Sequence, residues 1–135
     1  MPKIILVIDD EEIVVDITKR KLTQEGFAVI GVNDGEAALN VLREGPVDLI
    51  ILDVMMQGNE GFDLCLLLKA DSRYQNIPVL IITALDNLED KIRSFKVGAS
   101  DYILKPINEL ETNARVEAHL RIKSFQDHQK ELNNE

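Results

Sequence analysis

Three carboxylates, one hydroxyl and one ammonium stand directly after short apolar segments of this sequence. Asp9 and Asp10 follow the first such segment, and Asp53, Thr83 and Lys105 each follow a later one. Segments this short and this rich in Ile and Val are typical of β-strands that are covered on both faces, as in a parallel sheet. In open α/β sheets, ligands bind beyond the carboxyl ends of the strands. We therefore expect the five side chains to converge on one crevice.

Five strands are predicted. The strongest are the aliphatic runs 4–8, 49–52 and 79–82, and weaker candidates lie at 27–32 and 102–104. Helical patterns separate the runs, so that five strands alternate with five helices. Such alternation predicts one doubly wound α/β domain with right-handed crossovers. A chain of 135 residues with 45% hydrophobic residues is large enough for one such core.

Capping residues mark where the helices begin and end. Asp34, Asp86 and Asn108 are predicted N-caps, and each of the last two is followed three residues later by Glu. Gly26 and Gly98 are predicted to end the first and fourth helices.

The three carboxylates favour a divalent cation. Carboxylates this close repel one another, and without a cation some would be protonated at neutral pH. Oxygen ligands with no Cys or His favour Mg²⁺ over zinc. A carboxylate could then attack phosphorus, while Mg²⁺ and Lys105 neutralise the phosphoryl oxygens and Thr83 donates a hydrogen bond. Taken singly, an Asp after a strand is more often a helix cap, so it is the combination that favours a phosphoryl site.

Four short motifs resemble those of the receiver domain of bacterial response regulators. They are V-I-D-D-E-E at 7–12, L-D-V-M-M-Q-G-N-E-G at 52–61, I-T-A at 82–84 and G-A-S-D-Y-I-L-K-P at 98–106. The resemblance covers about residues 3–121. It implies a receiver domain at 1–121 with a flavodoxin-like three-layer sandwich, whose five-stranded parallel sheet has the order 2-1-3-4-5 and is covered by five helices.

The resemblance also implies a role for each polar residue. Asp53 would be the phosphoacceptor. Asp10 and Asp53 would bind Mg²⁺ directly, Asp9 would help through water, and the backbone carbonyl of Met55 would complete the protein ligands. Lys105 would contact the phosphoryl group. The chain would then be no enzyme beyond catalysing its own phosphorylation and dephosphorylation.

The switch and the partners are implied in the same way. Thr83 and Tyr102 match the two switch residues of the family. On phosphorylation Thr83 would move toward the phosphate and the ring of Tyr102 would turn inward. The peptide bond between Lys105 and Pro106 would be cis. A histidine kinase or a histidine phosphotransfer protein would donate the phosphoryl group. The surface of helix four, strand five and helix five would then act on an effector domain or a partner protein.

Two positions depart from the family pattern. Gln57, followed by Gly58, replaces the usual Pro four residues after the phosphoacceptor, and Ile107 replaces a common Phe after Lys-Pro. Neither departure removes a side chain that the acceptor role requires.

The composition narrows the location and the partners. A net charge of −9 argues against direct nucleic-acid binding by this chain. The single Cys65 cannot form an internal disulfide and is expected to be buried, so a reducing cytoplasm is the expected compartment. The sequence has no signal-peptide pattern and no apolar run that could span a bilayer, so no membrane partner is expected.

Residues 122–135 are predicted to extend the last helix beyond the domain. Their apolar seam, with spacings of 3, 4 and 3, consists of Ile122, Phe125, Gln129 and Leu132. A coiled coil needs a longer repeat than this, so a frayed tail, a linker and the start of a coiled coil in a homodimer all remain open. His119 and His128 are expected to be solvated.

Three other functions fit the pattern less well. A haloacid-dehalogenase-like phosphatase would carry a second Asp two residues after its nucleophile, where this chain has Met55. A flavodoxin-like cofactor module would need a Ser-, Thr- or Gly-rich phosphate loop after the first strand, where residues 9–12 are all acidic. A pseudo-receiver that binds partners without phosphorylation remains open, although the phosphorylation residues are intact.

Overall fold

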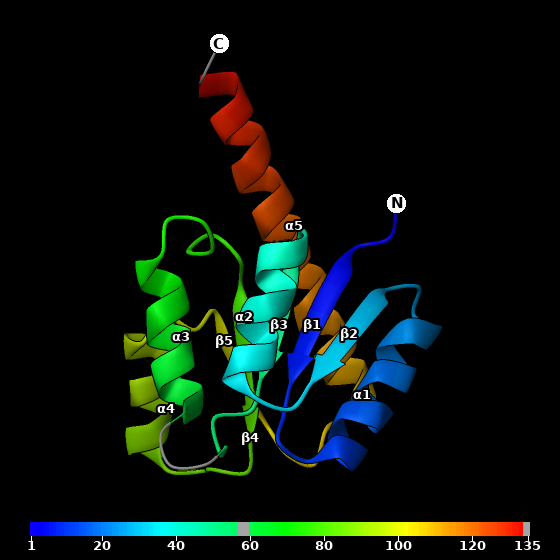
Figure 1. Ribbon diagram of the computed structural model, residues 1–135, viewed down its shortest axis with the longest axis vertical. Helices are drawn as coiled ribbons and strands as arrows, with labels where there is room; N and C mark the ends of the chain where they lie inside the picture. The colour runs from blue at the N-terminus through cyan, green and yellow to red at the C-terminus, as the bar shows by residue number, and fades with distance from the viewer. Residues whose placement is uncertain (57–59, 134–135) are drawn as a thin grey trace.

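In the computed structural model, which describes residues 1–56 and 60–133, the chain forms a three-layer α/β sandwich (Figure 1). The strands are β1 (Ile4–Ile8), β2 (Ala28–Val32), β3 (Leu49–Leu52), β4 (Val79–Thr83) and β5 (Asp101–Leu104). The helices are α1 (Glu12–Gln24), α2 (Gly35–Glu44), α3 (Glu60–Ala70), α4 (Leu88–Lys96) and α5 (Glu109–Asn133). The strands pair in parallel in the order β2-β1-β3-β4-β5, which confirms the predicted architecture. The departure at Gln57 and Gly58 lies outside the described residues.

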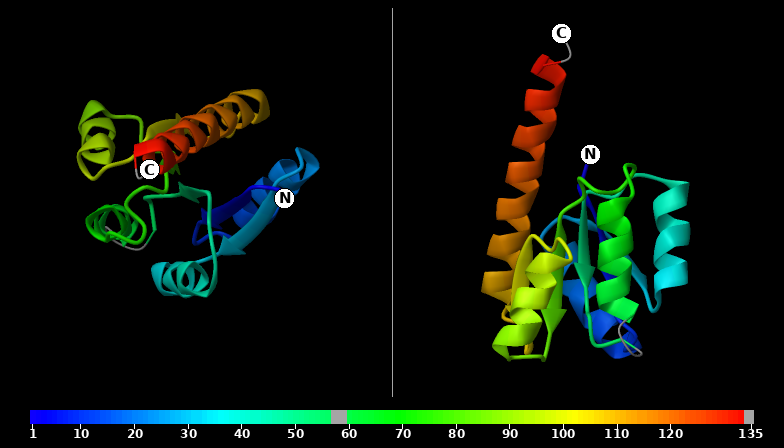
Figure 2. Two further views of the ribbon diagram at one scale, coloured as in Figure 1. Left: turned by 90° about the horizontal axis from the view of Figure 1, so that it is seen from above. Right: turned by 90° about the vertical axis from the view of Figure 1, so that its left-hand side faces the viewer.

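The central strands are apolar throughout because helices cover both faces of the sheet. Every residue of β3 and of β4 is buried, whereas the edge strands β2 and β5 are only partly buried. Figure 2 shows α1 and α5 on one face of the sheet and α2 and α3 on the other. Successive strand residues therefore enter opposite core layers.

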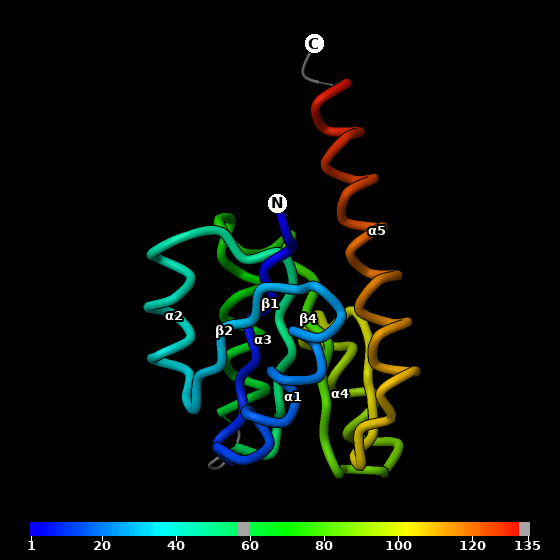
Figure 3. The backbone as a smooth tube through the Cα atoms, turned by 90° about the vertical axis from the view of Figure 1, so that its right-hand side faces the viewer, coloured from blue at the N-terminus to red at the C-terminus, as the bar shows by residue number. Residues whose placement is uncertain are grey.

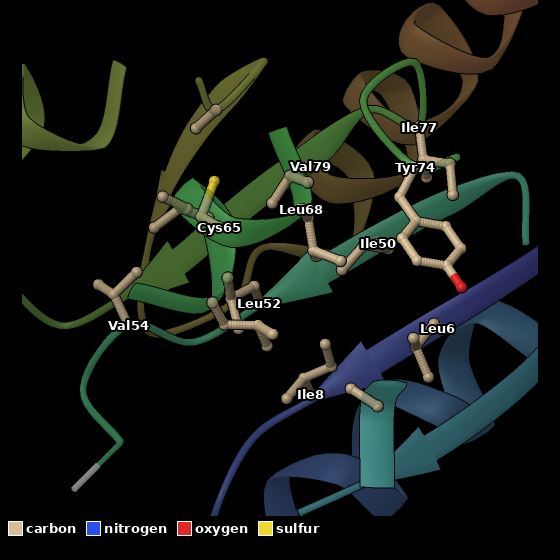
Figure 4. Close-up of a cluster of buried hydrophobic side chains, with 14 of the residues drawn as sticks. Leu6, Ile8, Ile50, Leu52, Val54, Cys65, Leu68, Tyr74, Ile77 and Val79 are labelled. Carbon is tan, nitrogen blue, oxygen red and sulfur yellow. The ribbon is translucent and has the colours of Figure 1, made fainter. Parts of the chain in front are cut away.

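Two core layers result from this alternation. Leu6, Ile8, Ile50 and Leu52 point toward α2 and α3 and pack with Leu68 and other buried residues (Figure 4). Their sequence neighbours point the other way and pack against Val116 and Leu120 of α5, and these neighbours include Ile5, Val7, Leu49 and Ile51. Burial of this much apolar surface is the main term that stabilises the fold.

The helix boundaries follow local capping chemistry. The carboxylate of Asp34 and the side-chain oxygen of Asn108 each accept a hydrogen bond from the N–H three residues later, as predicted. The predicted cap at Asp86 is wrong by one residue: Asn87 caps α4, with a hydrogen bond of 2.8 Å, and Asp86 instead pairs with Lys91. Asp86 and Asn87 are both good caps, and each has an acidic residue three positions later, so the sequence pattern fits either one.

Helix α5 extends beyond the sheet. It is continuous from residue 109 to residue 133, and its last turns project away from the other layers (Figure 3).

Gly26 and Gly98, predicted to end helices, have φ of 95° and 100°, a conformation that favours Gly. Within residues 1–56 and 60–133, no helix is both long and apolar enough to cross a membrane.

Candidate phosphoryl-acceptor site

Parallel pairing brings the predicted site residues to one edge of the sheet, where the arrowheads end in Figure 1. The last residues of β1 and β3 are paired, so Asp9 and Asp53 leave neighbouring strands at the same level. Thr83 ends β4 and pairs with the last residue of β5, which Lys105 follows directly. The peptide bond between Lys105 and Pro106 is cis, as predicted.

Asp9, Asp10 and Asp53 form an acidic cluster, in which one carboxylate oxygen from each residue lies within 4.8 Å of the other two. Asp9 and Asp53 are 3% and 5% exposed, whereas Asp10 is exposed to solvent. Buried carboxylates this close repel unless a cation compensates their charge. The oxygen ligands of this cluster, which is open to solvent at Asp10, therefore fit a hydrated divalent cation such as Mg²⁺.

Lys105 provides a positive charge beside the buried carboxylates. Its Nζ lies 2.8 Å from Oδ2 of Asp53 and 3.0 Å from Oδ2 of Asp9. Burial acts to lower the pKa of Lys105, but the hydrogen bonds to both carboxylates outweigh it and raise that pKa. Burial raises the pKa of Asp53, although Lys105 and the N–H of Met55 oppose the rise. An added cation would favour the ionised, nucleophilic form of Asp53.

Backbone N–H groups orient two of the carboxylates. The N–H of Met55 donates to Oδ1 of Asp53, and that of Glu11 donates to Oδ1 of Asp9, both at 2.9 Å. In the first turn of α3, Gly61 lies against the same segment, and a Cβ there would stand 2.8 Å from the carbonyl oxygen of Asp53. A larger residue at 61 would displace the acceptor backbone. Gly61 is the last residue of the motif at 52–61, but the sequence predicted no role for it.

The two predicted switch residues contact the same loop residue. Thr83 is fully buried, and its Oγ1 accepts a hydrogen bond of 3.3 Å from the N–H of Leu85. The hydroxyl of Tyr102 donates to the carbonyl oxygen of Leu85. Burial raises the pKa of Tyr102 and the nearby Asp90 and Asp86 raise it further, so the hydroxyl keeps its proton. Leu85 contributes only backbone groups, which no side-chain pattern could reveal.

Residues 5–117 match the protein family described as the response regulator receiver domain. The chain belongs to this family. The four motifs at 7–12, 52–61, 82–84 and 98–106 all lie within this matched range. The resemblance is therefore confirmed at the level of the family.

Several relatives of this receiver domain are longer regulators. The transcriptional regulatory protein YvrH of Bacillus subtilis (strain 168) is 44% identical over 118 residues, which are 87% of this chain and 48% of YvrH. The response regulator PleD of Caulobacter vibrioides (strain NA1000 / CB15N) is 44% identical over 119 residues, which are 88% of this chain and 26% of PleD. This chain thus spans half or less of either relative.

A solved structure confirms the receiver fold. A putative response regulator from Chloroflexus aurantiacus J-10-fl is 30% identical and superposes with a TM-score of 0.85, over 90% of this chain and 99% of that one.

One surface of the receiver domain, formed by α4, β5 and α5, carries a partly buried ionic cluster. The carboxylate of Asp101 accepts hydrogen bonds of 2.7 and 2.8 Å from Nη1 of Arg115 and lies 3.0 Å from Nε2 of His119. Burial acts to raise the pKa of Asp101, but these hydrogen bonds hold it below its usual range. The expectation that His119 is solvated is wrong, because its side chain is only 18% exposed and lies against Asp101.

Exposed apolar side chains accompany these charges. Leu88, Ile92 and Phe95 are 71%, 46% and 53% exposed and lie along one face of α4. Leu110, at the start of α5, is 83% exposed. Apolar side chains beside charges of both signs are typical of a surface that contacts another protein.

Proposed function

We propose that Asp53 accepts a phosphoryl group with the help of Mg²⁺, and that phosphorylation alters the α4–β5–α5 surface. The observation that carries this proposal is the approach of Lys105 Nζ to within 2.8 Å of a buried Asp53 in an acidic cluster. An oxygen of Asp53 would form a bond to phosphorus as the bond from phosphorus to a donor histidine nitrogen breaks. The nitrogen keeps the electron pair, and an acyl phosphate forms. The domain would catalyse only its own phosphorylation and the hydrolysis of the resulting acyl phosphate.

The protein ligands of Mg²⁺ would be Asp10, Asp53 and the backbone carbonyl of Met55, with Asp9 acting through water. When bound, Mg²⁺ neutralises charge on the phosphoryl oxygens in the transition state. Lys105, already beside Asp53, would pair with another of those oxygens. The Oγ1 of Thr83 would donate to the phosphoryl group once it is in place. These roles agree with the burial and position of each side chain.

The surface beside Lys105 suits a phosphoryl donor. A cavity of about 280 Å³ is lined by Val14, Ile17, Thr18 and Lys21 of α1 and by Lys105, Pro106 and Ile107. Its apolar lining could receive a helix of a histidine kinase or of a histidine phosphotransfer protein. A helix at this place would bring its phosphohistidine to the edge of the sheet that holds Asp53.

The output would pass through the α4–β5–α5 surface. Lys91, Arg115, Asp101 and Glu111 line a common cavity and carry charges of both signs. Two copies related by a two-fold axis could match these charges, so a homodimer fits this surface, as does an effector domain or a partner protein. Because the relatives are longer, we propose that residues 122–135 form a linker helix, or the start of a coiled coil, after the receiver domain at 1–121.

The amino-acid composition supports two further proposals, on nucleic-acid binding and on the cellular compartment. A net charge of −9 favours output through protein contacts rather than direct nucleic-acid binding. The lone, buried Cys65 suits a reducing compartment, so we place the domain in the cytoplasm.

Intact mass spectrometry tests the proposal. Incubation with acetyl phosphate and Mg²⁺ should add one phosphoryl group, and chelation of Mg²⁺ should prevent it. Asp10→Asn should need more Mg²⁺ for the same labelling, since it removes a direct ligand. Equal labelling with and without chelator would contradict the metal role. No labelling under any condition would instead indicate a pseudo-receiver.

A further inference from the structure

A groove lies between α2 and α3, apart from the acidic cluster and from the α4–β5–α5 surface. It encloses about 570 Å³. Its walls are positions 36, 39, 40 and 43 of α2 and positions 60, 63, 64 and 67 of α3. Both sets recur every three or four residues, so each helix presents one continuous stripe and the groove follows the helix axes. At 1.5 Å per residue, the walls extend for about two helical turns.

The floor of the groove is apolar and continuous with the hydrophobic core. Leu64 belongs to the hydrophobic core, and Leu39 packs against that core. Leu67 stands at the edge and is 48% exposed, and its neighbour Leu66 is 55% exposed. An apolar side chain of a partner could therefore contact the exposed Leu67 and the core residues below it in a pocket that is already formed.

The rim of the groove is predominantly acidic. Glu36, Glu60 and Asp63 carry negative charge there, against Arg43 alone. Oε1 of Glu60 accepts a hydrogen bond of 3.0 Å from the N–H of Gly35, which joins α2 to α3 at one end of the groove. In the described part of the chain, Glu36 and Asp63 have no ion-pair partner, so their charges remain available to a ligand.

We propose that this groove binds an amphipathic helix of a partner protein, with aliphatic side chains on Leu39, Leu64 and Leu67 and with Lys or Arg against Glu36 and Asp63. A third helix packs into a groove between two helices by placing its ridge of side chains along the shared stripe. The charge of the rim selects the partner. The chain's own tail, residues 121–135, has three basic and three acidic residues and is a poor match for an acidic rim. We therefore assign the groove to a different, basic chain rather than to the tail of a second copy.

A synthetic helical peptide tests the proposal on the unphosphorylated protein, so its outcome does not depend on phosphorylation of Asp53. The probe has about four helical turns, with Leu at i, i+3, i+4 and i+7 and Lys at the positions that flank this apolar stripe, where they face the rim. A second peptide keeps every Lys but replaces Leu with Gln, and a third keeps Leu but replaces Lys with Glu. Backbone amide chemical shifts locate the binding site, and fluorescence anisotropy gives the Kd.

The first peptide should shift resonances of α2 and α3 and bind at least about tenfold tighter than the other two. Asp63→Lys and Leu67→Gln should each weaken binding several-fold, whereas Ile92→Gln, an exposed apolar residue of α4, should not. Both altered side chains are exposed to solvent, so the variants should remain folded, and thermal unfolding checks this. Shifts confined to α1 or α4, or equal binding of the Gln peptide, would overturn the proposal. So would a dimer without peptide that Leu67→Gln dissociates, since that would assign the groove to a second copy.

Discussion

The hydroxyl of Tyr102 donates a hydrogen bond to the backbone carbonyl oxygen of Leu85. The N–H of the same Leu85 donates to Oγ1 of Thr83. One residue of the loop after β4 is therefore bonded both to a buried hydroxyl beside the acceptor edge and to the edge strand β5. A displacement of Thr83 by a phosphoryl group would release the hydrogen bond between Leu85 and Thr83 and alter the one between Leu85 and Tyr102. Charge added at Asp53 would then have a route to the α4–β5–α5 surface.

Thr83→Ala should still be phosphorylated but should lose most of the gain in partner binding on phosphorylation. In the proposed mechanism Thr83 senses the phosphoryl group and forms no bond to phosphorus, so labelling by acetyl phosphate should proceed while the switch fails. Binding of a partner, or self-association, is measured by titration with the phosphorylated and unphosphorylated proteins.

Thr112→Ala is the matched control. Thr112 is also a buried Thr, at 3% exposure, and its hydroxyl has no hydrogen-bond partner within the described residues. It should retain the full phosphorylation-dependent gain. A Thr83→Ala protein with an unchanged gain would remove Thr83 from the switch.

Phospho-Asp53 should hydrolyse slowly compared with receiver domains that are tuned for a rapid response. Hydrolysis requires a water aligned with the P–O bond that breaks, and polar side chains near the acceptor can hold it. The positions two residues beyond Asp53 and Thr83 are Met55 and Leu85, whose side chains cannot hydrogen-bond to that water. Loss of this alignment would slow hydrolysis by about tenfold to a hundredfold, or roughly 1.4–2.8 kcal/mol of barrier.

Decay of the phosphorylated form, followed by mass spectrometry in excess Mg²⁺, measures this rate. The double variant Met55→Asn with Leu85→Glu should decay faster than the parent. An equal or slower decay would show that backbone geometry controls hydrolysis here, although the acceptor role of Asp53 would stand.

The thiol of Cys65 should be unreactive in the folded protein. Cys65 is fully buried, and burial raises its pKa to about 11. Only about a thousandth of it is then thiolate at pH 8, and the thiolate is the form that reacts. Iodoacetamide should label it in denaturant but not in buffer. As a positive control, Leu66→Cys in a Cys65→Ala background places a thiol at an exposed neighbour and should react at once. Equal labelling of Cys65 with and without denaturant would contradict the packing of α3.

Asp101→Asn should destabilise the fold in a manner that depends on pH. The pKa of Asp101 in the folded protein lies below its ordinary value of 3.8, so the unfolded chain binds more protons between the two pKa values. The stabilisation is complete above the ordinary pKa and is lost as the pH falls through the folded-state pKa. Urea unfolding at several pH values should show a variant less stable at pH 7, with the difference vanishing in acid. Asp63→Asn, whose exposed carboxylate has no ion-pair partner among the described residues, is the control and should cost less stability at pH 7.

Much of the architecture was predictable because the central strands are covered on both faces. In β3 and β4 every position is buried, so the sequence is a run of aliphatic residues that no surface segment would carry. The edge strand β2 is harder to recognise, since its residues are only partly buried or exposed. The start of α4 was misplaced by one residue because Asp86 and Asn87 offer the same chemistry at adjacent positions.

The residues of the candidate site could be predicted where the type of side chain alone indicates its chemistry. Asp53 and Lys105 could be singled out because polar residues follow four of the strands in combination, although an Asp after a strand is, taken singly, more often a helix cap. The contact between His119 and Asp101 depends on how α5 packs on β5, which no local pattern specifies. The need for Gly61 arises from close packing on the backbone of Asp53, and it appears only once α3 is in place.

Location of the phosphoryl group tests the central claim most directly. The protein is phosphorylated with acetyl phosphate and Mg²⁺, the acyl phosphate is reduced with borohydride, and the digested peptides are sequenced by mass spectrometry. Reduction of an aspartyl phosphate leaves homoserine, so position 53 should be identified as homoserine and Asp9 and Asp10 should remain Asp. Asp53→Asn should give no homoserine at all. Homoserine at position 9 or 10 in the parent protein, or continued labelling of Asp53→Asn, would contradict the assignment of Asp53 as the acceptor.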